Sequence, residues 1–220
     1  MEYLIVLLPL LGSIIAGFFG KIIGDKKSQL LTCLLVFISA ILSLFIFYEV
    51  LVNDYSSNKL IFNWISSGDF QVNWSIFIDP LTSVMLVVVS LISSIIHFYS
   101  IGYMSHDPHK PRFMAYLSLF TFAMLTLVTA DNFLQLFFGW EGVGLCSYLL
   151  IGFWYRKPSA NSAAIKAFIV NRVGDFGFAL GIFLIFYLFG TVNYDEVFLK
   201  IPEFVNKEIS LLNNSPPFHF

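Results

Sequence analysis

The sequence has few charged residues and few cysteines, and each shortage excludes a class of protein. Asp, Glu, Lys and Arg make up only 12% of its 220 residues, about half the share found in an ordinary soluble domain. A net charge of −2 and an isoelectric point near 6.0 exclude a nucleic-acid binder, which carries a basic excess. Cys33 and Cys146 lie in apolar runs without metal or redox spacing, which excludes a disulfide-stapled secreted domain.

The stretches between the few charged residues are long hydrophobic runs. Hydrophobic residues make up 58% of the chain and the mean hydropathy is +0.81, so we predict an all-α polytopic membrane protein rather than a disordered chain. A helix needs about 20 mainly apolar residues to cross a hydrocarbon layer of ~30 Å. The first run lacks the flanks of a cleaved signal peptide, so we expect it to be a span. Six runs qualify: Tyr3–Gly20, Leu30–Tyr48, Pro80–Met104, Phe113–Ala130, Asn132–Tyr155 and Asn161–Phe189.

Two further segments have patterns that differ from those of the spans. Between residues 70 and 76 apolar and polar residues alternate, which is the period of a strand, and we expect a short β-hairpin over residues 60–78 at the membrane surface. After Gly190, apolar residues recur at helical spacing among Glu and Lys, which predicts an amphipathic surface helix ending at Pro216. The expected organisation is 1–52 with two spans, 53–79 with the hairpin, 80–189 with four spans, and 190–220 with the surface helix.

The basic residues are distributed unequally between the loops. Loops on the electrically negative side of a membrane, the cytoplasm or the matrix, collect Lys and Arg. The loops after the first, third and fifth runs hold seven Lys and Arg, whereas the remaining loops and the tail hold Lys59, Lys200 and Lys207. We therefore expect the first group of loops on the negative side, with the hairpin and both termini on the positive side.

Four charged residues lie inside the runs: Glu141 in the fifth, and Lys166, Arg172 and Asp175 in the sixth. A charge at the middle of a spanning helix costs roughly 2.5–3.5 kcal/mol, so such residues are usually turned inward, paired and functional. At 1.5 Å per residue, Glu141 and Arg172 lie about 21–22 Å from the basic ends of consecutive antiparallel helices, so we expect them to be able to meet. Asp175 follows Arg172 at i+3 and can pair with it, whereas Lys166 has no carboxylate partner on its own helix.

These four charges allow two interpretations. In the structural one, Glu141, Arg172 and Asp175 neutralise one another and hold two helices together, although a buried ion pair adds little stability over an apolar replacement. In the functional one, they transfer protons or ions, because a buried Glu or Lys changes its pKa readily. Arg172 cannot release its proton, so its role would be electrostatic. His97 in the third run is a weaker candidate, either a proton relay or an interfacial hydrogen-bonding residue.

Glycines and a histidine-containing loop have simpler interpretations. Three glycines between residues 139 and 144, and three between 174 and 181, predict close helix approach, with a hinge or water access as the alternative. His106, Asp107 and His109 share one loop, but the prolines within and after this group make it a stiff surface turn, and we expect no metal there.

Four segments resemble one protein family. HFYSIGYM, RFMAYLSLF, FFGWEGVGLCSYLLIGFW and KAFIVNRVGDFGF, all between His97 and Phe178, closely resemble chain 5 (chain L in bacteria) of proton-pumping NADH–quinone oxidoreductase, respiratory complex I. The resemblance extends over the whole chain, including the IDPLT sequence at the third run and the hairpin. It implies that Glu141 lies in a proton-translocation channel of an antiporter-like fold. It also implies that Lys166, Arg172 and Asp175 belong to the polar network of that channel.

The resemblance also implies partners and cofactors. The family is related to sodium/proton antiporter subunits, and its members themselves bind no NADH, flavin, iron–sulfur cluster or quinone headgroup. The assembled complex would use NADH, FMN, iron–sulfur clusters and ubiquinone. The implied partners are other complex I membrane subunits, the lipid bilayer and protons, and no nucleic acid, in a mitochondrial inner membrane or a bacterial plasma membrane.

The chain departs from the family in length. Family members have about a dozen or more helices, whereas here the sixth run is the last, and the buried Lys of the next helix and the later channel residues are missing. We therefore expect an N-terminal fragment that cannot pump protons alone. Three hypotheses remain: a complex I proton-pumping subunit, the large subunit of a multisubunit cation/proton antiporter, and a non-conducting scaffold.

Overall fold

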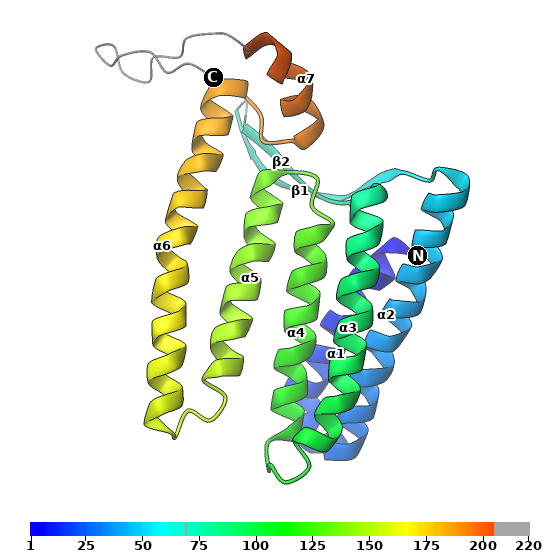
Figure 1. Ribbon diagram of the computed structural model, residues 1–220, viewed down its shortest axis with the longest axis vertical. Coiled ribbons are helices and arrows are strands. Elements are labelled where there is room, and N and C mark those ends of the chain that lie inside the picture. Colours follow the sequence, from blue (N-terminus) through cyan, green and yellow to red (C-terminus); the bar gives the residue numbers. More distant parts are fainter. Residues whose placement is uncertain (69, 205–220) are drawn as a thin grey trace.

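The computed structural model describes residues 1–68 and 70–204, and within them six long helices stand side by side below a two-stranded sheet (Figure 1). Each of these six helices is long and apolar enough to cross a membrane, so the predicted six-span fold with a surface hairpin is confirmed. The elements are α1 (Glu2–Ile23), α2 (Asp25–Asn53), β1 (Ser57–Ser67), β2 (Phe70–Ile78), α3 (Pro80–Tyr103), α4 (Lys110–Val128), α5 (Phe133–Ile151), α6 (Pro158–Phe189) and α7 (Tyr194–Phe204).

Several helix ends differ from the predicted ones, and each has a local cause. α2 begins at Asp25, earlier than expected, because only Gly24, at a φ of 91°, interrupts the helical path after α1. α5 ends at Ile151 rather than Tyr155, and α6 begins at Pro158, whose fixed φ suits a first helical turn. The expected surface helix begins as α7, and its predicted end at Pro216 lies outside the described residues.

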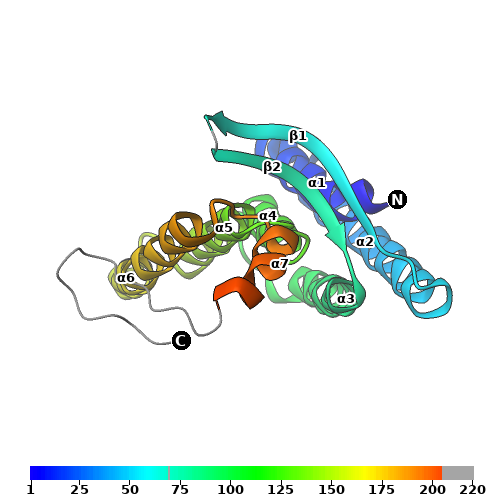
Figure 2. The ribbon, with the colours of Figure 1, turned by 90° about the horizontal axis from the view of Figure 1, so that it is seen from above.

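The six long helices form a compact group of four and an extension of two. α1 packs against α2 and α4, α3 packs against α2 and α4, and α5 continues the row from α4 (Figure 2). α6 is the outermost helix and packs mainly against α5. One long side of α6 is therefore left uncovered by the described part of the chain, as its many exposed apolar residues show.

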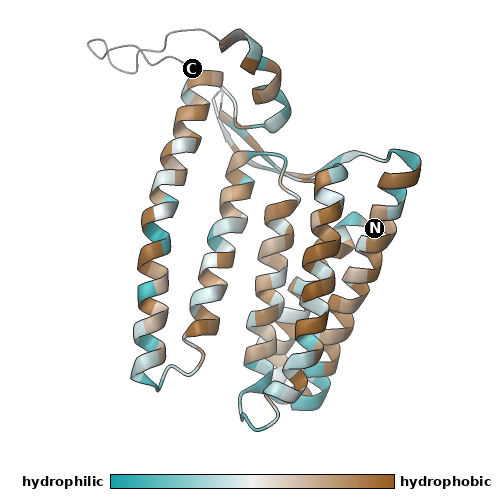
Figure 3. Ribbon diagram, in the orientation of Figure 1, coloured by the Kyte–Doolittle hydropathy of each residue, from teal (hydrophilic) through white to brown (hydrophobic). Residues whose placement is uncertain are grey.

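The N-terminus of α1, the hairpin and α7 lie at one end of the helices, which we call the hairpin end (Figure 1). The α1–α2, α3–α4 and α5–α6 connections lie at the opposite end, which we call the loop end. The seven Lys and Arg that were assigned to these loops from the sequence lie in the connections or in the adjoining helix ends. Figure 3 shows the hydrophilic residues concentrated at these ends, with a few along α6.

Polar side chains attach the hairpin to α1. Glu2, buried in the first turn of α1, accepts hydrogen bonds from Tyr55 and from the Ser57 hydroxyl, the latter at 2.8 Å. Its carboxylate also lies 2.8 Å from the Lys59 ammonium. The hydrogen bond to Glu2 raises the pKa of Lys59, because it stabilises the charged amine.

A second set of bonds attaches the hairpin to α4 and α5. The side chain of Gln135 bonds both backbone groups of Ser75 in β2, at 3.0 and 2.8 Å. Asn132 caps α5 by accepting the Gln135 backbone N–H at 2.8 Å, and its amide donates to the Asn73 carbonyl at 2.9 Å. The Phe77 backbone N–H donates to the last turn of α4 at Thr129. The sheet is therefore fixed across the helix ends at defined positions.

Two of the predicted close-approach glycines lie where α5 meets α4. A Cβ on Gly139 would lie 2.6 Å from the Leu127 Cα, and one on Gly142 would lie 3.0 Å from the Ala123 Cβ. A Cβ on Gly144, or on the three glycines between 174 and 181, would have no neighbour within 4 Å among the described residues. These four glycines therefore meet no other helix within the described part of the chain.

We expect Gly139→Ala to destabilise the helix group, because the added methyl group would meet the backbone of α4 and force the two helices apart. Overpacking of this kind costs about 1–3 kcal/mol. The measurement is the thermal unfolding midpoint of the protein in detergent, and Gly144→Ala on the same helix is the matched control. Equal midpoints for the two variants would show that α4 and α5 separate without cost.

Candidate functional site

Three of the predicted site residues form one charged cluster between α5 and α6. Glu141 of α5 and Arg172 of α6 form a direct ion pair, in which the guanidinium donates to the carboxylate. Arg172 Nη1 also lies 3.6 Å from Asp175 Oδ2, one turn along α6. The structure brings the three together because positions equally far from the connection of two antiparallel helices lie at the same depth.

The cluster contains a fourth member, which the sequence analysis missed. The indole Nε1 of Trp140 donates a hydrogen bond to Asp175 Oδ1 at 2.8 Å. Asp175 is therefore bound on one oxygen by Trp140 and faces Arg172 with the other, while Glu141, the next residue after Trp140, holds Arg172. The available signal was a tryptophan beside the buried glutamate, because an indole N–H in an apolar setting needs an acceptor.

Burial decreases across the cluster from Asp175 to Arg172. The side chain of Asp175 is 7% exposed, that of Glu141 is 24% exposed and that of Arg172 is 45% exposed. The Arg172 guanidinium also lies over the Phe168 ring, 4.5 Å from its centroid. The expectation that the charges turn inward therefore holds for Asp175 and is wrong for Arg172 within this chain, because α6 has only one principal neighbour.

The structure does not bring Lys166 into this cluster. Its side chain is exposed on α6, and it forms no hydrogen bond or ion pair with any described residue. The absence of a partner on its own helix agrees with the sequence analysis.

His97 lies in a separate polar contact between α3 and α4. Its ring is fully buried, with Nδ1 2.8 Å from the Ser93 carbonyl and Nε2 3.0 Å from the Ser118 hydroxyl. The hydroxyls of Ser93 and Thr121 bond to each other in the same contact. His97 thus satisfies both ring nitrogens within its own pair of helices, and it does not touch Glu141.

A buried carboxylate at the hairpin end was also missed by the sequence analysis. Asp131, 7% exposed, accepts hydrogen bonds from the amides of Asn132 at 2.6 Å and Asn58 at 3.3 Å. Burial raises the pKa of Tyr194 above its usual value, and the negative charge of Asp131 raises it further. The Tyr194 backbone N–H donates to the Asp131 carbonyl at 3.1 Å. This group fixes α7 to the α4–α5 turn.

The histidine-containing loop forms contacts with the α5–α6 connection. Asp107 accepts the backbone N–H of His109 at 2.7 Å and the indole N–H of Trp154 at 2.9 Å. Burial acts to raise the pKa of Asp107, but these two hydrogen bonds together with the positive charges of His109 and Arg112 hold the pKa below its usual value. Within residues 1–68 and 70–204, no three His, Cys, Asp or Glu side chains gather as metal ligands would.

Two family descriptions match the sequence. Residues 64–114 match the description "NADH-Ubiquinone oxidoreductase (complex I), chain 5 N-terminus". Residues 130–215 match "NADH:quinone oxidoreductase/Mrp antiporter, TM". The second segment contains the whole charged cluster.

Curated relatives match over nearly the whole chain. NADH-ubiquinone oxidoreductase chain 5 of Chondrus crispus is 52% identical over 96% of this chain and 32% of its own length. The chain 5 protein of Arabidopsis thaliana is 59% identical over 90% of this chain and 30% of its own. NADH-quinone oxidoreductase subunit L of Rickettsia bellii is 52% identical over 94% of this chain and 32% of its own. The chain spans about a third of the length of these relatives.

Solved structures share the fold at lower identity. A chain of the Mrp complex from Dietzia superimposes with a TM-score of 0.77 at 21% identity, covering 93% of this chain and 22% of that one. A chain of an archaeal membrane-bound sulfane sulfur reductase superimposes with a TM-score of 0.74 at 16% identity, covering 90% of this chain and 39% of that one. The arrangement of the six helices and the hairpin therefore also occurs in these two membrane complexes.

Proposed function

Because this chain belongs to the family of NADH–ubiquinone oxidoreductase chain 5 and subunit L, we propose that it is part of the antiporter-like, proton-translocating membrane subunit of complex I. The observation that carries the proposal is the cluster of Glu141, Arg172 and Asp175 between two helices long enough to cross a membrane. Ionisable groups that face one another at this depth are costly, and they mark ion or proton pathways.

The geometry gives each member of the cluster a role. Glu141 exchanges protons, because a carboxylate between membrane helices can hold or release one. Arg172 keeps its charge throughout and lies between two carboxylates, bonded to Glu141 and 3.6 Å from Asp175. When Arg172 moves toward Asp175, Glu141 loses its counter-charge and is free to accept a proton. Trp140 holds Asp175 in place on the other side of Arg172.

The free energy for this exchange would come from electron transfer from NADH to ubiquinone elsewhere in the assembly. We assign NADH, FMN, the iron–sulfur clusters and ubiquinone to other subunits, and protons to this one. The conduction path would be completed by protein that covers the open side of α6. Arg172 is 45% exposed there, and a charge facing hydrocarbon costs roughly 2.5–3.5 kcal/mol, which supports a covering helix rather than lipid.

The orientation follows from the two ends of the molecule. The loop end holds seven Lys and Arg, so we place it on the negative side, the matrix or the cytoplasm. The hairpin, α7 and the N-terminus then face the positive side of a mitochondrial inner membrane or a bacterial plasma membrane. The antiporter hypothesis shares the fold with the Mrp relative, but identities of 52–59% to complex I chains favour the complex I assignment.

We expect Glu141→Gln to lower proton pumping about tenfold or more while the complex still assembles, because glutamine keeps the shape of the side chain but cannot carry a proton. Proton uptake into sealed vesicles measures pumping, and the amount of purified complex measures assembly. Unchanged pumping would remove Glu141 from the pathway, whereas loss of assembly would favour the scaffold hypothesis.

We expect Lys166→Arg to impair pumping more than its effect on assembly explains, because arginine keeps the charge but does not release a proton. Lys26→Arg, an exposed lysine at the loop end, serves as the control. Both variants are compared by pumping per assembled complex. Equal values would make Lys166 an electrostatic element rather than a titrating one.

We expect Trp140→Phe to change the pH dependence of pumping, because Asp175 loses the hydrogen bond that holds it opposite Arg172. Trp154→Phe is a matched control: it removes an indole hydrogen bond of similar length to an aspartate, Asp107, outside the cluster. The two variants are compared over a series of pH values. Identical pH profiles would show that Trp140 contributes packing alone.

A further inference from the structure

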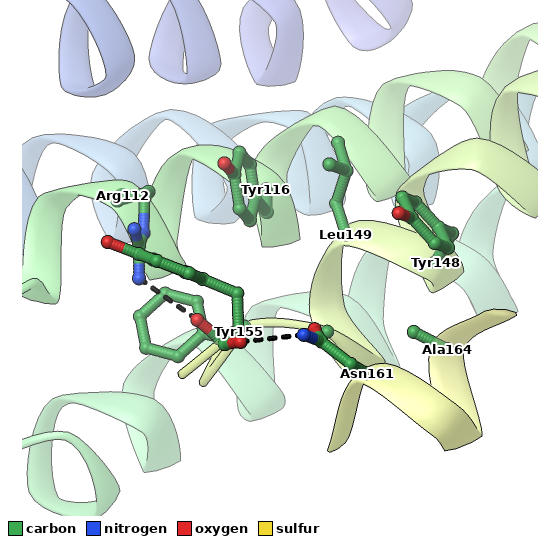
Figure 4. Close-up of a pocket in the computed structure, with 9 residues that line it drawn as sticks. Arg112, Tyr116, Tyr148, Leu149, Tyr155, Asn161 and Ala164 are labelled. Carbon is green, nitrogen blue, oxygen red and sulfur yellow. Dashed lines mark hydrogen bonds between the residues drawn. The ribbon is translucent and has the colours of Figure 1, made fainter. Parts of the chain in front are cut away.

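A cavity of ≈ 180 Å³ with both polar and apolar walls lies at the loop end, where α4, α5 and α6 meet, and it is separate from the Glu141 cluster (Figure 4). Its walls combine one cation with several aromatic hydroxyls. Its polar lining consists of Arg112 and Tyr116 of α4, Tyr148 of α5, Tyr155 of the α5–α6 connection and Asn161 at the start of α6.

Arg112 brings an incompletely satisfied cation to this cavity. One guanidinium N–H donates to the Phe153 carbonyl at 3.0 Å, and the guanidinium carbon lies 4.5 Å from the Phe153 ring centroid and 5.4 Å from that of Tyr155. Its Nε is buried without a hydrogen-bond partner. No carboxylate among the described residues lies within ion-pair distance of Arg112. A guanidinium with donors to spare favours an anionic acceptor.

The other polar groups of the cavity supply further donors. The hydroxyls of Tyr116, Tyr148 and Tyr155 form no hydrogen bond with any described residue. The Asn161 amide donates to the Tyr155 carbonyl at 2.8 Å, which holds the connection against the first turn of α6 (Figure 4). Each free phenolic O–H can donate to an oxygen of a bound anion.

The surroundings of the cavity are cationic. An adjoining cavity of ≈ 140 Å³ shares Arg112 and Tyr155 and is also lined by Arg156 and Lys157. The nearby carboxylate is that of Asp107, and its two oxygens already accept hydrogen bonds from Trp154 and the His109 backbone. The local charge therefore favours an anion even with Asp107 ionised.

The position of the cavity at the helix ends fits the headgroup level of a membrane. It is placed between the end of α5 at Ile151 and the start of α6 at Pro158, and Trp154 and Tyr155 are 39% and 52% exposed beside it. Exposed Trp and Tyr at helix ends mark the membrane–water interface.

We propose that this cavity binds the phosphate group of an anionic phospholipid. Arg112 and the hydroxyls of Tyr116 and Tyr148 donate to the phosphate oxygens, while Arg156 and Lys157 attract the negative headgroup. Basic pockets between membrane helices on the negative side are suited to such headgroups. The proposal does not depend on the proton pathway, because none of these residues belongs to the Glu141 cluster.

The test uses the membrane complex that contains this chain, purified in detergent, depleted of lipid and titrated with phosphatidylglycerol. Retained lipid is counted by native mass spectrometry, and stability is followed by the thermal unfolding midpoint. We expect phosphatidylglycerol to be retained and to raise the midpoint, whereas phosphatidylcholine and inorganic phosphate do neither. We expect Arg112→Gln to weaken phosphatidylglycerol binding about tenfold, as the loss of one charge-assisted hydrogen bond would.

Because Arg112 also bonds the Phe153 carbonyl, a double variant, Tyr116→Phe with Tyr148→Phe, removes only the hydroxyls and keeps the rings. We expect it to weaken phosphatidylglycerol binding several-fold, and we expect Lys26→Gln, an exposed lysine at the same end, to leave binding unchanged. Undiminished binding in the double variant would overturn the proposal. Equal retention of phosphatidylcholine, protection by inorganic phosphate alone, or failure of the complex to retain phosphatidylglycerol would also overturn it.

Discussion

A charged side chain between membrane helices needs an opposite charge on a neighbouring element. This requirement determines how α5 and α6, the two outer helices, pack together. α6 carries Arg172 and Asp175 in its apolar length, and α5 supplies Glu141 and the indole of Trp140 to meet them. Ring contacts of Phe178 with Phe137 and Trp140 pack against the same place. The position of α6 is thus set by polar bonds and aromatic packing with one helix. In contrast, each of the helices α1 to α4 packs against at least two of the others.

A second requirement acts at the hairpin end, where backbone groups leave the helices and need partners. Helix side chains provide some of these contacts to the sheet. Gln135 of α5 bonds both backbone groups of Ser75 in β2, and Glu2 of α1 bonds side chains of β1. Asp131 adds α7 through Tyr194. Polar residues that would be costly in the membrane interior are therefore used where the chain turns at its surface.

The sequence was sufficient for the spans, because hydropathy and the thickness of a bilayer determine them directly. The meeting of Glu141 with Arg172 also followed from it, since depth depends only on the rise per residue. Two features could not be predicted in this way: the hydrogen bond from Trp140 to Asp175, and the exposure of Arg172. Both depend on the rotation of each helix about its own axis, and the rise per residue does not determine that rotation. Hydropathy likewise marks where a membrane ends and not where a helix ends, so the helical start of α2 at Asp25 was missed.

The two attachments of the hairpin set the relative heights of the helices. The bonds of Glu2 to Lys59 in β1 and of Gln135 to Ser75 in β2 act on the two strands of one sheet, at neighbouring positions of its register. A slide of α5 past α1 along the helix axes would break at least one of these attachments or the hydrogen bonds between the two strands. The hairpin therefore resists sliding of α5 along α1. The height of Glu141 on α5 is therefore tied to that of α1 through the two strands of the sheet.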